Sequence, residues 1–167
     1  MSKLTYRHLW AKFSTLSEHN KNRVTLALRS LNQSFLRESQ EDSILDLTMA
    51  LEVLLVPNET QELTYKISMR LAALLGRYDP KLSVQEVFSQ MKQIYKHRSN
   101  VVHGNISKVA KSREIKVDDV TTVPTVDIAI KYLRKALDIL IESPRLLDSA
   151  IIDTEILLSG NYGIAGQ

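Results

Sequence analysis

The spacing of the apolar residues limits the possible folds of this chain most strongly, because it follows the period of an α-helix almost throughout. Segment 41–56 is the most apolar. Its hydrophobic residues cover more than half of a helical circumference, so we expect it to be central and buried. Other helices are predicted near the N-terminus and over 22–38, 61–75, 83–103, 126–142 and, weakly, 146–158. The pattern predicts an all-α fold, an up-and-down helical bundle of about five to six helices.

Proline, glycine and serine mark the expected helix boundaries. Pro57 and Pro144 cannot continue a helical hydrogen-bond ladder, so the helices before them should end there. Gly76 is expected to end helix 61–75 as a C′ residue in the left-handed conformation. Ser83 should cap the next helix, with Glu86 completing a capping box.

The remaining segments carry weaker signals. One stripe of helix 22–38 holds Val24, Leu28, Leu31 and Phe35. Residues 105–123 are expected to be basic and irregular, with a short extended piece where EIKVDDV alternates. We treat 1–158 as a single domain and 159–167 as a flexible tail.

The composition excludes several classes of protein. With 44% hydrophobic and 25% charged residues, the chain resembles neither a disordered nor a collagen-like protein. It has no cysteine, which excludes disulfides, cysteine–zinc sites and thiol catalysis, and its four histidines lack metal-ligand spacing, so we expect no metal or cofactor. No signal peptide or apolar run long enough to span a membrane is found, so we expect a cytoplasmic protein. The net charge of +3 permits a nucleic-acid partner without arguing for one.

The helix predicted over 83–103 contains a residue that breaks its apolar stripe. The stripe passes through Val84, Phe88, Met91, Tyr95, Arg98 and Val102. An unpaired guanidinium is costly to bury, so Arg98 must meet a carboxylate, a cleft or a ligand. His103 follows five residues later, at the helix end before Gly104.

The segment from Arg98 to His103, RSNVVH, resembles the Arg-x4–6-His signature of HEPN domains. Upstream, ALEVLL and ELTYKISMRLAALLG look like the corresponding helices of the ApeA-like HEPN subgroup, and the resemblance covers about 42–140. It implies an endoribonuclease that cleaves RNA, such as tRNA, without a metal, through the 2′-hydroxyl and with a cyclic phosphate product. It also implies a homodimer whose two motifs line one cleft. Such domains occur in toxin–antitoxin and antiphage systems, with an antitoxin, another inhibitory partner or a further domain of a longer chain.

The residue types suit phosphodiester cleavage, which needs a proton-transfer group and a cation facing the charged transition state. Arg98 offers phosphate a planar fork of donors, and histidine is the side-chain type suited to proton transfer near neutral pH, which makes His103 the candidate for that role. The negative end of the helix dipole favours the imidazolium form, which suits His103 as a general acid or electrostatic stabiliser. Five residues turn a helix through about 500°, so the two side chains point about 140° apart. They converge if the helix frays near Val101, if Arg98 reaches around, or if they come from different protomers.

The sequence departs from the family pattern at Ser99, where active members often have Asn, Asp or His. Asn100 offers the missing amide, and Ser99 can still bond a phosphate oxygen. The candidate catalytic residues are therefore Arg98, His103, Ser99 and Asn100. Each has an alternative: Arg98 in a buried ion pair with Glu52, His103 on a terminal carbonyl, and Ser99 and Asn100 as solvated or capping residues.

Three more residues are candidates for supporting the site. Glu52 and Arg70 are expected to form an inter-helix ion pair, with active-site support as the alternative. Tyr95, one turn before Arg98, is expected in the core, with base stacking as the alternative. His97 is expected to face solvent.

A basic band surrounds the motif and either follows an RNA backbone or is ordinary solvated surface. It holds Lys92, Lys96, Lys108, Lys111, Arg113 and Lys116. The leading hypothesis is a metal-independent ribonuclease. The alternatives are a HEPN-like module that binds RNA or nucleotides without cleaving them, and a purely structural dimerisation domain.

Overall fold

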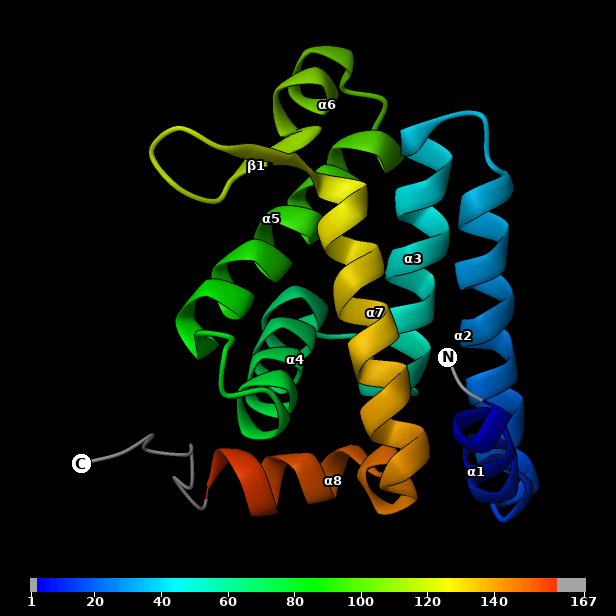
Figure 1. The fold of residues 1–167 in the computed structure, drawn as a ribbon. Coiled ribbons are helices and arrows are strands. Elements are labelled where there is room, and N and C mark those ends of the chain that lie inside the picture. The colour runs from blue at the N-terminus through cyan, green and yellow to red at the C-terminus, as the bar shows by residue number, and fades with distance from the viewer. Residues whose placement is uncertain (1–2, 159–167) are drawn as a thin grey trace.

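The computed structural model describes residues 3–158 and is all-α apart from one short hairpin, as the sequence predicts (Figure 1). The tail predicted over 159–167 lies outside the described residues. The α-helices are α1 (Lys3–Ser14), α2 (Glu18–Leu36), α3 (Gln40–Leu55), α4 (Leu63–Tyr78), α5 (Val84–Val102), α6 (Ile106–Ser112), α7 (Thr125–Glu142) and α8 (Ser149–Ile151). The hairpin pairs β1 (Glu114–Lys116) with β2 (Thr122–Pro124), and a 3₁₀-helix (Pro144–Leu147) and a π-helix (Ile152–Leu157) flank α8.

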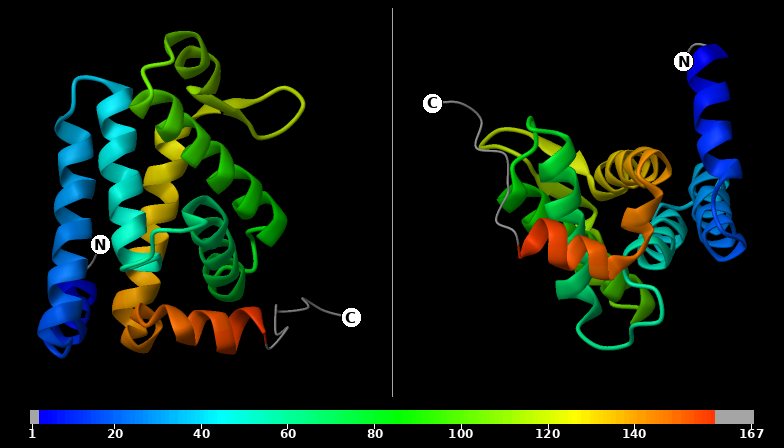
Figure 2. Two further views of the ribbon diagram at one scale, coloured as in Figure 1. Left: turned by 180° about the vertical axis from the view of Figure 1, so that it is seen from behind. Right: turned by 90° about the horizontal axis from the view of Figure 1, so that it is seen from below.

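Three helices stand side by side and two others pack across them. Helices α2, α3 and α7 are upright in Figure 1, whereas α5 is inclined to them and packs on α4 (Figures 1 and 2). Helix α6 and the hairpin lie at the end of the molecule where α5 finishes. The up-and-down arrangement therefore describes α2, α3 and α7, and α5 departs from it.

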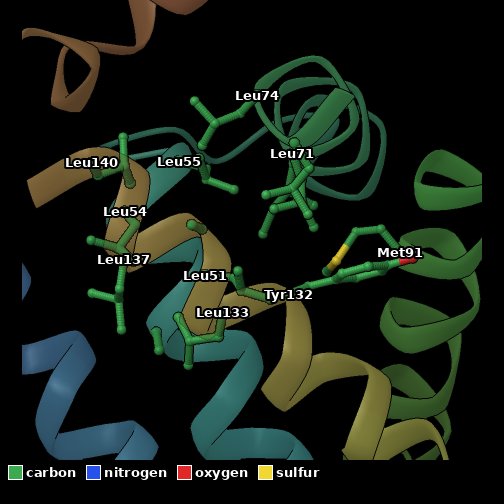
Figure 3. Packing of buried hydrophobic residues seen from close by; sticks show 14 of the residues in the cluster. Leu51, Leu54, Leu55, Leu71, Leu74, Met91, Tyr132, Leu133, Leu137 and Leu140 are labelled. Carbon is green, nitrogen blue, oxygen red and sulfur yellow. The ribbon is translucent and has the colours of Figure 1, made fainter. Parts of the chain in front are cut away.

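Helix α3 is the centre of the core, as its broad apolar surface predicts. Its Leu51, Leu54 and Leu55 are fully buried among leucines of α4 and α7 and Met91 of α5 (Figure 3). Truncating one such leucine to alanine typically costs about 2–5 kcal/mol of folding free energy. This packing fixes one side of α5 and leaves residues such as Lys92 and Lys96 on its other side exposed.

Several local predictions differ from the structure, and the helix predicted over 22–38 is α2, Glu18–Leu36. Helix α4 continues past Gly76 to Tyr78, so Gly76 is not a left-handed C′ residue. A Cβ atom at Gly76 would lie 2.3 Å from Cγ2 of Val84, so the glycine is needed where α4 and the start of α5 approach closely. The segment predicted to be irregular forms α6, which Asn105 caps by accepting a hydrogen bond from the Lys108 N–H at 3.3 Å.

Other local predictions are confirmed in whole or in part. The Ser83 hydroxyl accepts from the Glu86 N–H and begins α5, as predicted. The Glu86 carboxylate accepts from Gln90 Nε2 at 2.8 Å, and over residues 3–158 it makes no bond to the Ser83 N–H, so the capping box is not completed. Helix α7 starts directly after Pro124 and ends before Pro144. The alternating segment forms β1, in which Ile115 is buried opposite Val123.

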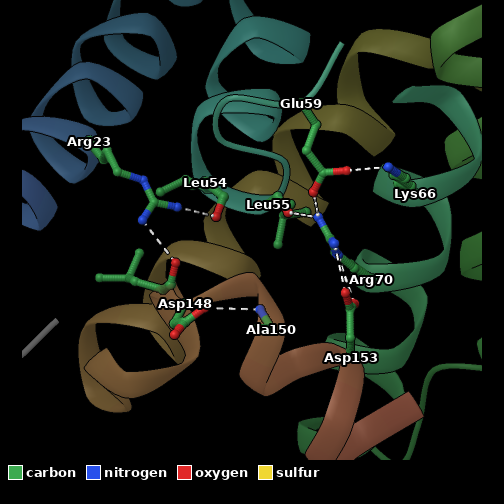
Figure 4. Close-up of polar contacts among 10 residues, drawn as sticks. Arg23, Leu54, Leu55, Glu59, Lys66, Arg70, Asp148, Ala150 and Asp153 are labelled. Carbon is green, nitrogen blue, oxygen red and sulfur yellow. Dashed lines mark hydrogen bonds and ion pairs between the residues drawn. The ribbon is translucent and has the colours of Figure 1, made fainter. Parts of the chain in front are cut away.

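Two buried arginines close the C-terminal end of α3, where the last carbonyl groups lack helical partners (Figure 4). Arg23 of α2 donates to the carbonyl oxygens of Val53 and Leu54 at 3.0 and 2.8 Å. Arg70 of α4 donates to the carbonyl oxygen of Leu55 at 2.9 Å. Both arginines therefore tie a neighbouring helix to the end of α3.

The predicted ion pair between Glu52 and Arg70 is wrong. Arg70 instead makes a two-bonded pair with Asp153, at 2.8 and 2.7 Å, and a second ion pair with Glu59 (Figure 4). The hydrogen bonds that Arg70 donates to Asp153 and Glu59 raise the pKa of its guanidinium above the ordinary value. The contacts of Arg70 are those of a structural residue that fastens the C-terminal π-helix to α4.

Candidate functional site

The C-terminal end of α5 is defined by hydrogen bonds that the sequence encodes locally. The Gly104 N–H donates to the Val101 carbonyl and the Asn105 N–H to the Asn100 carbonyl, each at 3.0 Å. Gly104 has φ +64°, the left-handed conformation that glycine adopts without strain. These bonds form a Schellman motif, which places His103 at the last turn of the helix.

Arg98 is half-buried and lies beside an aromatic ring. Its guanidinium carbon is 5.6 Å from the centre of the Tyr95 ring, a cation–π contact. Between residues 3 and 158, no carboxylate forms an ion pair with Arg98. The alternative pairing of Arg98 with Glu52 is not formed, and Glu52 instead accepts a hydrogen bond from the Tyr95 hydroxyl.

Tyr95 is a core residue with a polar tip. Its side chain is buried, as predicted, and burial raises the pKa of its hydroxyl above the ordinary value. The hydroxyl therefore stays protonated at neutral pH and acts as a donor to Glu52. This hydrogen bond fixes the position of the Tyr95 ring, against which the Arg98 guanidinium lies.

His103 is exposed, and its side chain makes no hydrogen bond within the described part of the chain. Lys92, Lys96, Ser99 and His103 follow one another on α5 at steps of four, three and four, so they share its exposed face. Arg98 points about 140° away around the helix axis. Because α5 stays helical through Val102, fraying near Val101 does not bring Arg98 and His103 together.

Ser99 and Asn100 have different surroundings. Ser99 lines an open groove of about 640 Å³ along α5, together with Lys92 and Lys96. Asn100 also borders this groove, but its Nδ2 donates to the Lys108 carbonyl and the Ser112 hydroxyl at 3.3 and 3.2 Å. Asn100 therefore joins α6 to α5, and Ser99 keeps its hydroxyl on the groove.

His97 is fully buried, so the prediction that it faces solvent is wrong. Its Nδ1 lies 2.8 Å from the Ser112 hydroxyl oxygen, and its Nε2 has no hydrogen-bond partner among the described residues. Helix α6 covers part of His97, because Ser112 at its C-terminal end contacts the ring. The burial of His97 could be predicted from the sequence only if α6 were predicted first.

The stability of the protein is expected to fall as the pH drops below about 6.5, because His97 is buried in its neutral form. Burial lowers its pKa from the ordinary value of 6.5, although the nearby Glu41 raises it and Arg113 lowers it further. Below pH 6.5 the unfolded chain binds a proton that the folded chain resists, so the free energy of unfolding decreases. Urea unfolding at pH 7.5 and 5.5 measures the difference.

In His97→Gln this part of the pH dependence should disappear, whatever the change in overall stability. His19→Gln is the matched control, because His19 is exposed on α2. An unchanged difference between the two pH values in His97→Gln would contradict the assignment to His97.

The predicted basic band is divided by the fold. Lys96, Lys108 and Lys111 line one cavity of about 410 Å³ between α5, α6 and β1. Lys92 lies over the Phe88 ring, with its Nζ 5.5 Å from the ring centre, on the neighbouring groove. Arg113 is ion-paired with Glu41 at 2.7 Å and borders a different hollow, so it does not join the lysines.

Comparison with known proteins gave no match, whether with protein-family models, with curated proteins or with solved structures. None of the helices over residues 3–158 is both long and apolar enough to cross a membrane. Among those same residues, His, Asp and Glu nowhere gather in a group of three suited to a metal ion.

Proposed function

We propose that this protein is a metal-independent RNA endonuclease of the HEPN type. The observation that carries the proposal is that the motif arginine, Arg98, is half-buried at the end of α5 without a carboxylate partner in the described structure. A guanidinium that salt bridges leave free can bind a phosphate anion. In this proposal Arg98 stabilises the transition state and His103 transfers the proton.

The surroundings of Arg98 support this role. The Tyr95 ring supports the guanidinium from one side, and partial burial strengthens its interaction with an anion relative to bulk water. Ser99 offers a hydroxyl on the exposed side of the helix for a phosphate oxygen. Glu52 acts through Tyr95 and positions the ring.

The proposed catalytic unit is a homodimer. Arg98 and His103 diverge around α5, so one phosphodiester meets both most directly when they come from two protomers. The exposed side chains of Val102 and Ile106 flank His103 and offer apolar area for such a contact. The wider proposal is a cytoplasmic toxin or antiphage nuclease, held inactive by an antitoxin or another domain.

A cleavage assay on synthetic RNA in the presence of EDTA tests the proposed activity. Cleavage should persist with EDTA and leave a 2′,3′-cyclic phosphate, because the neighbouring 2′-hydroxyl is the nucleophile. The matched control is the same strand with 2′-deoxy sugars, which should remain intact. Cleavage of the deoxy strand, or cleavage that EDTA abolishes, contradicts the proposal.

Replacing Arg98 with alanine is expected to reduce cleavage by about 100-fold, because the transition state then lacks a charged hydrogen-bond donor. The free energy of unfolding should change by no more than about 1 kcal/mol, since Arg98 is held in the described structure by its cation–π interaction with Tyr95 rather than by an ion pair. Arg98→Lys keeps the charge without the planar fork of donors, so its cleavage rate should lie between those of the unaltered protein and Arg98→Ala. Initial cleavage rates and urea melts measure both quantities.

A decrease of several kcal/mol in the stability of Arg98→Ala would indicate a structural role for Arg98 and contradict the assignment.

A non-catalytic RNA-binding module is the second candidate. Two observations favour it: Ser99 replaces the usual polar partner of the motif arginine, and the Asn100 amide is engaged with α6. Retained RNA binding without cleavage under any buffer condition would support this candidate over the nuclease.

A further inference from the structure

The cavity between α5, α6 and β1, called here the α5–α6 pocket, concentrates positive charge. Lys96 of α5 and Lys108 and Lys111 of α6 line it, together with Asn100, Ser112 and Glu114. Within the described part of the chain, none of the three lysines forms an ion pair. Three ammonium groups around one cavity repel one another, and an anion between them would relieve that repulsion.

The one carboxylate of the pocket does not neutralise this charge. Glu114 accepts a hydrogen bond from the Thr122 hydroxyl at 2.9 Å, across the β1–β2 pair. One negative charge against three positive charges leaves the pocket cationic. The pocket therefore has the charge expected of a site for an anionic ligand.

A network of buried and half-buried side chains holds the two walls of the pocket together. The Ser112 hydroxyl on α6 contacts His97 Nδ1 at 2.8 Å and accepts from Asn100 Nδ2 at 3.2 Å, both on α5. The same hydroxyl bonds the Lys108 carbonyl at 2.7 Å. These bonds hold α6 against α5. Lys96 on α5 therefore lines the same cavity as Lys108 and Lys111 on α6.

The pocket adjoins the groove on which Ser99 lies. Lys96 and Asn100 border both, and His103 lies one turn farther along the same exposed face of α5. Lys92, Lys96 and Asn100 are each four residues apart, about 6 Å along the helix axis. A nucleotide strand following this face could place successive phosphates near these side chains.

We propose that the α5–α6 pocket binds successive phosphate groups of an RNA strand through Lys96, Lys108 and Lys111. This interaction deepens the proposed function, on which it rests, because it assigns an anchoring site whose α5 lysine, Lys96, lies about two helical turns before His103. The proposal does not include Arg113 of the basic band, because Arg113 is ion-paired with Glu41 on another surface.

Fluorescence anisotropy with a labelled 12-nucleotide oligouridylate tests the pocket. All variants are made in a His103→Ala background, so that the strand stays intact. Replacing Lys96, Lys108 and Lys111 together by glutamine should raise Kd by about 10–100-fold. It should also reduce the slope of log K against log salt by about 2, because three ammonium groups no longer neutralise the phosphates of the strand.

The matched control replaces Arg29, Lys131 and Arg134 by glutamine, which removes the same charge from exposed positions on α2 and α7. Its Kd should change by less than about threefold. Equal losses of affinity in the two triple variants would overturn the proposal, because net charge alone would explain them. If the pocket variant fails to fold, Lys111→Gln alone should reduce the salt slope by about 0.7.

Two further measurements distinguish RNA binding from free-nucleotide binding, and the pocket proposal from the nuclease proposal. Competition with uridine monophosphate at constant ionic strength tests free nucleotides, and binding as tight as that of the RNA strand would overturn the assignment to RNA. Cleavage is measured separately on the protein with His103 intact. If RNA binding depends on the pocket lysines but no cleavage occurs, the phosphate-binding proposal stands and the nuclease proposal is contradicted. If cleavage occurs but RNA binding does not depend on these lysines, the nuclease proposal stands and the phosphate-binding proposal is contradicted.

Discussion

Replacing His103 with alanine is expected to reduce RNA cleavage by about 1,000-fold while leaving the folded protein intact. Loss of a general acid or base typically lowers a rate by about 100- to 10,000-fold. His103 is exposed and its side chain has no partner among the described residues, so truncation removes no packing. Its backbone N–H still donates to the Ser99 carbonyl and ends α5.

The measurement is the initial rate of RNA cleavage, with circular dichroism to verify the fold. His19→Ala is the matched control, because it removes another exposed histidine from a helix far from the motif in sequence. In cells, toxicity upon expression should be relieved by His103→Ala and not by His19→Ala. Full cleavage by His103→Ala would remove this residue from the proposed mechanism.

Replacing Arg70 with methionine is expected to lower the free energy of unfolding by about 3 kcal/mol, because two carboxylates and one helix carbonyl lose their donor. Arg70 is buried and contacts Asp153, Glu59 and the Leu55 carbonyl at once. For a chain of this size the melting temperature should fall by roughly 6–12 °C. Methionine keeps much of the side-chain volume, so the decrease in stability reports mainly on the polar interactions.

Arg145→Met provides the comparison, since Arg145 is also ion-paired, with Glu155, but is exposed. Exposed ion pairs are typically worth less than about 1 kcal/mol, so its melting temperature should shift little. Thermal and urea unfolding measure both variants. Below its melting temperature, Arg70→Met should still cleave RNA, and a selective loss of cleavage would instead indicate active-site support.

Local signals in the sequence predicted the long helices and several of their ends, but not α6. Ser83 and Gly104 act on backbone groups a few residues away, so their effects on α5 follow from the sequence alone. The RSNVVHGN segment likewise fixes where Arg98 and His103 lie around one helix. The divergence of the two side chains was therefore predictable before any packing was known.

The face that a helix buries was less predictable. The apolar stripe of α2 includes Leu28 and Phe35, yet these side chains are 42% and 58% exposed. Ala27, Ser30 and Ser34 are buried instead. Small side chains let α2 approach α3 closely, so close packing and the bonds of Arg23 outweigh the burial of two large residues.

The sequence alone determined the helical period, the boundaries at Ser83 and Gly104 and the motif at the end of α5, because each depends on residues a few positions apart. Only the tertiary structure decided the partners of Arg70, the burial of His97 and the gathering of three lysines around one pocket. Those features join residues from different helices, and helix packing determines which side chains meet. The chain positions of Arg70 and Asp153 are 83 residues apart, and no local pattern connects them.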